Sequence, residues 1–79
     1  MFEFTLPSID PEMEYATITR WLKREGDRVT AGELILEVEA EKVNYELEAP
    51  ISGVLGSIVA VDGDEIKVGG TLALIEASA

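Results

Sequence analysis

The sequence predicts an all-β domain built from two similar sheets that a pseudo-two-fold axis relates. Short runs rich in Val, Ile, Thr and aromatic residues are separated by Gly, Asp and Pro, which is typical of strands and turns. Apolar residues nowhere recur at helical spacing over ten or more positions. The chain also repeats its own pattern, and two copies are too few for a solenoid, so two equivalent sheets in one small domain are favoured.

The repeat is defined by paired glycines, acids and aliphatic residues at a shift of 37 positions, from Gly26 to Gly63. Every matched position is identical or an aliphatic swap. The two copies are Gly26-Asp27-x-Val29-x-x-Gly32-x-x-Ile35-x-x-Val38-Glu39-Ala40 and Gly63-Asp64-x-Ile66-x-x-Gly69-x-x-Leu72-x-x-Ile75-Glu76-Ala77.

Four strands stand out in the pattern of β-branched and aromatic residues. The expected strands span residues 16–22, 34–40, 43–49 and 54–61. Turns are expected at residues 25–27 and 62–64, where Gly accepts the positive φ of a tight reversal. Pro7, Pro11 and Pro50 are expected at edges or in connections, because proline lacks the N–H that a central strand needs.

A β-hairpin is expected between the two copies of the repeat. Along residues 43–49 apolar and polar side chains alternate, so one face is apolar and the other carries acids. A two-residue turn at Glu41-Lys42 sets Ala40 opposite Val43, Val38 opposite Tyr45 and Leu36 opposite Leu47. A slip by one residue would oppose apolar to charged side chains, so this register is well specified.

The turn of this hairpin departs from the usual chemistry. Two-residue loops favour Asn-Gly or Asp-Gly because a type I′ turn needs positive φ at both central positions, so Glu41-Lys42 predicts a type I turn. The same register opposes Glu37 to Glu46, a like-charge pair that costs stability. Local rules tend to fail where function intervenes. The acids expected around Lys42 are Glu33, Glu37, Glu39, Glu41, Glu46 and Glu48.

Lys42 is the candidate functional residue. At the tip of a hairpin it is a long arm with a terminal amine held clear of the domain, and acidic neighbours favour its protonated form. A protonated amine is a poor Schiff-base nucleophile, but an enzyme that supplies an activated acyl group could acylate it. On turn chemistry alone, a solvated lysine without a special role remains the simpler interpretation.

Composition argues against several other classes of function. The chain has no Cys and no His, so we predict no metal site and no catalytic residue. Sixteen Asp and Glu against six Lys and Arg give a net charge of −10, which disfavours nucleic acids and anionic membranes as partners. No apolar run is long enough to cross a bilayer, and a cytoplasmic location fits this composition.

The repeat and the hairpin together resemble the lipoyl domains of 2-oxo acid dehydrogenase complexes over essentially the whole chain. The matching motifs are Leu6-Pro7-Ser8-Ile9, Ile18, Trp21-Leu22, Glu25-Gly26-Asp27, Gly32, Val38-Glu39-Ala40-Glu41-Lys42-Val43, Ala49-Pro50-Ile51-Ser52-Gly53-Val54, Gly63-Asp64 and Leu72-Ala73-Leu74-Ile75-Glu76. Each motif is weak alone, whereas their order and spacing are specific. The resemblance implies a flattened β-barrel (a barrel-sandwich hybrid) of two four-stranded sheets with pseudo-two-fold symmetry, and a lipoyl-lysine on a β-hairpin opposite the termini.

The resemblance also assigns roles to residues. Lys42 takes the position of the lipoyl attachment, and Glu39, Glu41 and Val43 form the surface around it that a ligase and partner enzymes recognise. The remaining assignment is that Gly32 and Gly53, at nearly symmetric offsets from Lys42, permit the turns that place the hairpin.

Two segments depart from the family pattern. The usual Asp-Lys-Ala is Glu41-Lys42-Val43 here. In the loop after the first strand, where the family has Gly-Glu and later Glu-Gly, this chain has Asp10-Pro11 and Tyr15-Ala16, with Met13 retained. Because that loop neighbours the hairpin in such domains, we expect it to affect the choice of partner.

The implied function is that of a non-catalytic lipoyl carrier. Lipoate amide-linked to Lys42 would act as a swinging arm that moves acyl groups and electrons between active sites. The implied partners are lipoate ligase or lipoyl transferase, a thiamin-dependent 2-oxo acid decarboxylase, an acyltransferase catalytic domain and dihydrolipoamide dehydrogenase, with the domain itself monomeric. Two alternatives stay open: a biotin carrier domain of a carboxylase, which would have Met on both sides of the lysine, and an unmodified interaction domain of the same fold.

Residues 1–77 are expected to form the lipoyl domain, and residues 78–79 to begin a linker. The chain is accordingly interpreted as a domain excised from a dihydrolipoamide acyltransferase subunit. The expected location is the cytoplasm, or the mitochondrial matrix in a eukaryote.

Overall fold

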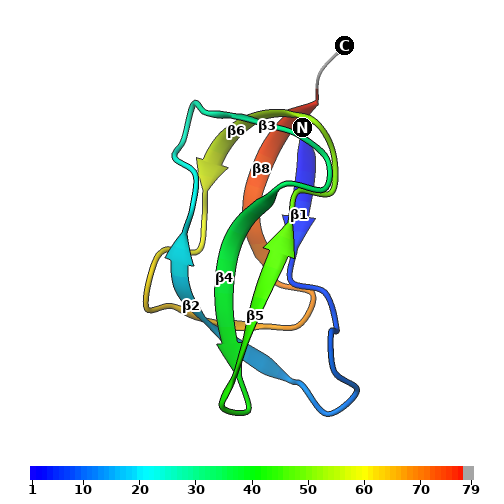
Figure 1. Ribbon diagram of the computed structural model, residues 1–79, viewed down its shortest axis with the longest axis vertical. Helices are drawn as coiled ribbons and strands as arrows, with labels where there is room; N and C mark the ends of the chain where they lie inside the picture. The colour runs from blue at the N-terminus through cyan, green and yellow to red at the C-terminus, as the bar shows by residue number, and fades with distance from the viewer. Residues whose placement is uncertain (78–79) are drawn as a thin grey trace.

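The computed structural model describes residues 1–77, which form eight β-strands and contain no helix. The strands are β1 (Phe2–Thr5), β2 (Tyr15–Trp21), β3 (Arg28–Val29), β4 (Leu34–Ala40), β5 (Val43–Glu48), β6 (Gly53–Ile58), β7 (Glu65–Lys67) and β8 (Thr71–Ala77). They build two four-stranded antiparallel sheets, in the orders β5-β4-β2-β7 and β1-β8-β6-β3 (Figure 1). The predicted all-β class and two-sheet architecture are confirmed.

The internal repeat appears as equivalent strands with crossed hydrogen bonds. β2, β3 and β4 in one copy correspond to β6, β7 and β8 in the other. The N–H of Gly26 donates to the carbonyl of Leu55 at 2.7 Å, and the N–H of the equivalent Gly63 donates to the carbonyl of Ile18 at 2.8 Å. Their φ angles are 93° and 91°. Because each copy closes its turn on the other copy's strand, the two copies are related by a pseudo-two-fold axis.

The core lies between the two sheets and is aliphatic. Its side chains with less than 2% exposure are Leu6, Ile18, Val29, Ile35, Leu36, Val38, Leu55, Leu72 and Ile75. Trp21 packs at the edge of this core, and its indole N–H donates to the carbonyl of Ala60 at 2.7 Å, so the ring is half-buried with its polar atom paired. Throughout residues 1–77 no polar or charged side chain is buried, so apolar packing fills the interior between the sheets.

The four predicted strands are confirmed as β2, β4, β5 and β6, with small shifts at their ends. Pro7, Pro11 and Pro50 lie in connections, as expected. Gly32 has a φ of 90° and turns the chain before β4, also as expected.

Gly53 has a different role from the one predicted. It lies inside β6 rather than in a turn, opposite Ala77 of β8. A Cβ built at this position would overlap the carbonyl oxygen of Glu76. Gly53 therefore permits the close approach of two strand backbones, a common reason for glycine within a strand.

The elongated shape puts the hairpin and the chain ends at opposite poles. The molecule measures 36 × 21 × 18 Å. The β4–β5 turn lies at one end of the long axis, and the N-terminus and the end of β8 lie at the other (Figure 1). This follows from the symmetry, because β8 and β1 in one sheet correspond to β4 and β5 in the other. The hairpin is opposite the N-terminus and the end of β8, in agreement with what the resemblance implied.

Candidate functional site

The β4–β5 hairpin has the predicted register. Ala40 faces Val43, Val38 faces Tyr45 and Leu36 faces Leu47 across the ladder. The like-charge pair is also present, with Glu37 opposite Glu46. The turn therefore consists of two residues, Glu41 and Lys42, and both are exposed.

The predicted type I conformation of this turn is wrong. Glu41 has a φ of 52° and Lys42 a φ of 63°, the positive values that a type I′ turn requires. The physical reason lies in the flanking strands: Val38 and Ala40 are buried, so core packing fixes the register, and only a primed turn matches the strand twist. Two consecutive non-glycine residues in this region cost about 1–2 kcal/mol each. The tip of the hairpin is thus locally strained.

An open groove runs beside Lys42 where two strands separate. The β2–β4 ladder ends at the pair Thr17–Glu39, and the first residues of β2 then pair with β7. The gap is a groove of about 520 Å³, with Tyr15 on its β2 side and Lys42 on its hairpin side. We call it the Lys42 groove; it is lined by Glu12, Glu14, Tyr15, Ala16, Thr17, Glu39, Ala40, Glu41, Lys42 and Glu65.

The Lys42 groove is acidic, but not through the acids that the sequence indicated. Of the expected six, only Glu39 and Glu41 line it. Glu12, Glu14 and Glu65 were missed because they come from remote segments, a loop and β7. For Glu12 and Glu14 the sequence signal was the expectation that their loop neighbours the hairpin. For Glu65 it was the equivalence of β7 with β3, which does not by itself pair β7 with β2.

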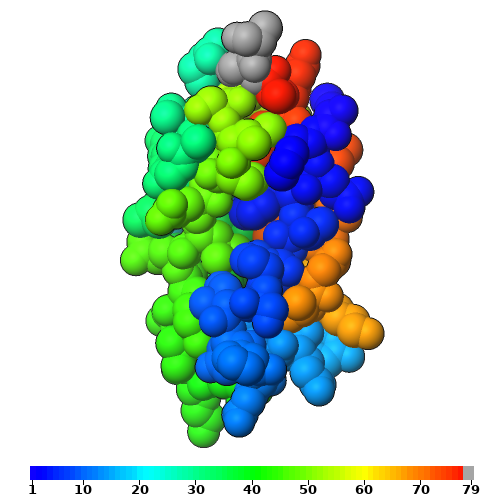
Figure 2. All heavy atoms as spheres, turned by 90° about the vertical axis from the view of Figure 1, so that its right-hand side faces the viewer, coloured from blue at the N-terminus to red at the C-terminus, as the bar shows by residue number. Residues whose placement is uncertain are grey.

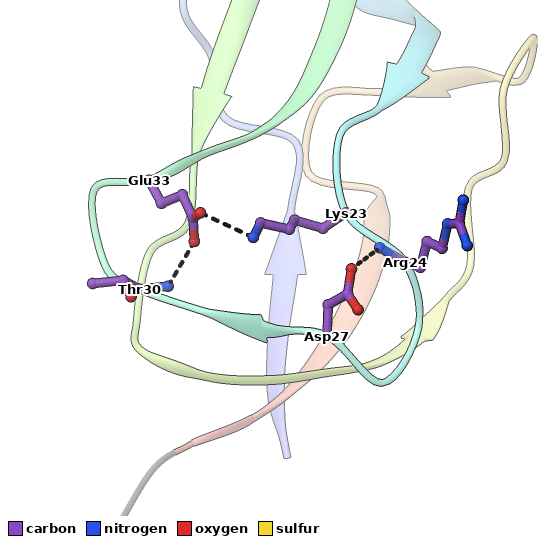
Figure 3. A network of polar contacts seen from close by, with 5 residues as sticks. All are labelled: Lys23, Arg24, Asp27, Thr30 and Glu33. Atoms are coloured by element: carbon purple, nitrogen blue, oxygen red, sulfur yellow. Dashed lines mark hydrogen bonds and ion pairs between the residues drawn. The ribbon is translucent and has the colours of Figure 1, made fainter.

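Two of the expected acids are engaged elsewhere. Glu37 lies 3.5 Å from Nη2 of Arg20, and Glu33 lies 3.0 Å from Nζ of Lys23. Glu33 also accepts a hydrogen bond from the N–H of Thr30 at 3.1 Å (Figure 3). The hydrogen bond from Lys23, followed by that from Thr30, lowers the pKa of Glu33 below its usual value. Grouping these acids around Lys42 was wrong, because strand geometry carries them toward other bases.

The loop of residues 6–14 lies against the hairpin (Figure 2). It is shaped by a turn in which the N–H of Met13 donates to the carbonyl of Asp10 at 2.9 Å. The carboxylate of Asp10 accepts from the N–H of Glu12 at 2.9 Å, and Pro11 supplies the fixed φ that such a turn favours. Met13 is buried with 4% exposure and anchors the loop. The expectation that this loop neighbours the hairpin is therefore confirmed.

Other kinds of site find little support in the described part of the chain. Within residues 1–77, no group of three or more acids, histidines or cysteines is placed to hold a metal ion. The same residues include no helix that could span a membrane. The described residues do place an exposed primary amine, that of Lys42, at the tip of a hairpin at the pole opposite the N-terminus and the end of β8. This arrangement defines a small all-β domain that presents a lysine at the tip of a hairpin.

Comparison with known proteins specifies this class. A family model described as "Biotin-requiring enzyme" matches residues 2–75. The chain belongs to this family of biotinyl and lipoyl carrier domains, which are not themselves catalytic.

The relatives are subunits of 2-oxo acid dehydrogenase complexes. The chain is 44% identical over 91% of its length to dihydrolipoyllysine-residue acetyltransferase component 3 of the mitochondrial pyruvate dehydrogenase complex of Arabidopsis thaliana. It is 40% identical over its whole length to the dihydrolipoyllysine-residue succinyltransferase component of the 2-oxoglutarate dehydrogenase complex of Bacillus subtilis. The chain spans only 14% and 19% of these two proteins.

A solved structure matches the whole fold. The lipoyl domain of the 2-oxoglutarate dehydrogenase complex from Azotobacter vinelandii superimposes with a TM-score of 0.78 and 29% identity, covering 99% of this chain and all of that one. The resemblance to lipoyl domains is therefore confirmed in family, sequence and fold.

Proposed function

We propose that lipoate is amide-linked to Nζ of Lys42 and that the domain serves as the swinging arm of a 2-oxo acid dehydrogenase complex. The single observation that carries the proposal is the position of Lys42, exposed at a two-residue turn at the pole opposite the termini. A tether at one pole and a cofactor at the other give the arm the greatest reach, and a tethered arm raises the effective concentration at each active site.

The residues present fit this cofactor. An exposed primary amine at the tip of a hairpin can be acylated by an enzyme that brings an activated lipoyl group. The amine displaces the leaving group, loses a proton and becomes a neutral amide. When bound, lipoate supplies a dithiolane that takes up acyl groups and electrons, while the protein supplies reach and recognition.

The proposed partners follow from this role. They are lipoate ligase or lipoyl transferase, a thiamin-dependent 2-oxo acid decarboxylase, the acyltransferase catalytic domain and dihydrolipoamide dehydrogenase. We further propose a monomeric domain, spanning residues 1–77 and followed by a linker that begins at residues 78–79, which lie outside the described residues. The proposed location is the cytoplasm of a bacterium or the mitochondrial matrix, since the relatives include bacterial proteins and two named as mitochondrial.

Glu39, Glu41 and Val43 are proposed as the recognition surface around the lysine. Glu39 and Glu41 line the Lys42 groove, and Val43 is 48% exposed although it is aliphatic. An exposed apolar side chain beside two carboxylates allows a partner to bind through one apolar contact and through two negative charges.

A biotin carrier is the second candidate, because the matching family includes biotin-requiring enzymes. Against this candidate, biotin carrier domains typically have Met on both sides of the modified lysine. Here Lys42 lies between Glu41 and Val43. An unmodified interaction domain of the same fold is the third possibility, and the same experiment separates all three.

The test is intact-mass analysis after co-expression with lipoate ligase and, separately, with biotin ligase. We expect complete lipoylation, no biotinylation, and no lipoylation of the Lys42→Arg variant, with Lys67→Arg as the matched control that stays fully modified. A Glu39→Gln or Val43→Ala domain should be modified more slowly. Biotin on Lys42 would establish the second candidate, and no modification by either ligase would leave the interaction domain.

A further inference from the structure

The Lys42 groove contains one aromatic side chain, which is neither part of the acidic lining nor part of the core. Tyr15 is 49% exposed at the start of β2, while its neighbour Ala16 is 2% exposed and points into the core. Alternation along the strand therefore directs Tyr15 outward. This is also a position where the chain departs from the family pattern, which has Glu there.

The strand register brings Tyr15 to the hairpin tip. β2 and β4 pair at Ile18–Val38 and Thr17–Glu39, so continuing the antiparallel count sets Tyr15 across from Glu41, the residue before Lys42. The ladder ends before that point, so the strands diverge and leave room between them. Tyr15 and Lys42 accordingly line the same groove from opposite sides.

We propose that the lipoyl arm on Lys42 has a resting position in this groove, with its dithiolane ring against the ring of Tyr15. The inference rests on the proposed attachment of lipoate to Lys42. A groove of about 520 Å³ is large enough for a small ligand, and Tyr15 is the one aromatic side chain in its mainly acidic lining. The lipoyl amide and the dithiolane are neutral, so the surrounding carboxylates do not repel them.

The ring of Tyr15 offers the dithiolane sulfurs an aromatic contact among these carboxylates. Contacts between sulfur and an aromatic ring are favourable and biased toward the ring edge, and they shift a population about two- to tenfold. Such a contact holds the arm part of the time without locking it. The phenol hydroxyl is not required, because the attraction comes from the ring.

The experiment is NMR of the fully lipoylated domain, with lipoylation verified by intact mass. We expect nuclear Overhauser contacts between the Tyr15 ring protons and the dithiolane protons in the wild type and in Tyr15→Phe, and their loss in Tyr15→Leu. Tyr45, which lies in β5 and does not line the Lys42 groove, is the internal control and should show no such contact. Backbone amide spectra establish that each variant is folded.

A second measurement does not depend on assignments. The dithiolane ring contains a stereocentre and is dichroic by itself, so the near-ultraviolet circular dichroism of the lipoylated domain is compared with that of free lipoamide. The dithiolane signal should differ from that of free lipoamide in the wild type and in Tyr15→Phe, and this difference should be lost in Tyr15→Leu. A lipoylated wild type with no contact to Tyr15 and an unchanged dichroism in Tyr15→Leu overturns this inference and leaves the proposed function standing. Absence of lipoylation at Lys42 removes both.

Discussion

β4 and β8 hold equivalent positions in the two copies of the repeat, yet they end differently. β4 passes through the strained turn at Glu41-Lys42 into β5, whereas β8 ends beside the first strand of the chain, β1. The pair β1–β8 forms with no turn at that pole, so strand pairing in this fold does not depend on one. The strained conformation at Glu41-Lys42 therefore belongs to the two-residue connection of β4 to β5, which the equivalent pair β8 and β1 does not have.

The loops that lead out of the corresponding strands β5 and β1 differ as well. Residues 49–52 connect β5 to β6, while the longer segment 6–14 connects β1 to β2. The longer loop turns toward the hairpin and contributes Glu12 and Glu14 to the Lys42 groove. The two copies share a scaffold, and this longer loop is a departure from symmetry at the pole that carries Lys42.

The largest effect is expected where the two copies differ at a buried position. Gly53 in β6 corresponds to Ala16 in β2. In Gly53→Ala the added Cβ meets the carbonyl of Glu76, so β6 and β8 must move apart, and the free energy of unfolding should fall by about 1–3 kcal/mol. Urea unfolding measures it. The matched change Ala16→Gly adds no atom and should cost about 1 kcal/mol or less. A Gly53→Ala domain that is as stable as the wild type would contradict the crowding at Gly53.

An intermediate effect is expected at the strained turn. Glu41→Asn replaces a residue that resists positive φ with one that tolerates it, so the free energy of unfolding should rise by about 0.5–1 kcal/mol. The rate of lipoylation should fall at the same time, because Glu41 belongs to the proposed recognition surface. Thermal unfolding and a timed ligase assay measure the two quantities. A variant that gains no stability would mean that the turn is not strained.

These positions also show how far the sequence could predict the structure. The repeat, the central strands and the hairpin register followed from it, because the alternation that buries Val38 and Leu47 leaves one acceptable pairing. The short strands β3 and β7 did not, since two or three residues carry too little periodicity. The turn type was wrong because local preference at Glu41 yields to packing of the strands behind it.

The candidate site was predictable only in part, for a related reason. Lys42, Glu39 and Glu41 are adjacent in the chain, so a local motif suffices to find them. The rest of the groove depends on where β2 separates from β4 and on how the 6–14 loop folds over, which no local pattern encodes. The outward direction of Tyr15, likewise, follows only once the strand boundaries are known.

The smallest effect concerns an ion pair that only one copy possesses. Lys23 and Glu33 correspond to Ala60 and Gly70, although both copies keep the turn hydrogen bond, Glu33 N–H to Thr30 carbonyl and Gly70 N–H to Lys67 carbonyl. The pKa of Glu33 is lowered by its hydrogen bonds from Lys23 and Thr30, so its contribution to stability is present above the unfolded pKa. That contribution is lost as the pH falls through the lowered, folded pKa.

Glu33→Gln keeps an acceptor for the N–H of Thr30 and removes the charge. The wild type should therefore melt slightly higher than Glu33→Gln at neutral pH, and the two melting temperatures should converge on acidification. Amide exchange at Thr30 should accelerate in acid relative to exchange at Lys67, its counterpart in the second copy, after correction for intrinsic rates. A difference in melting temperature that persists at acidic pH would show that the shape of the Glu33 side chain, and not its charge, causes the effect. The ion pair between Lys23 and Glu33 would then not stabilise the first copy.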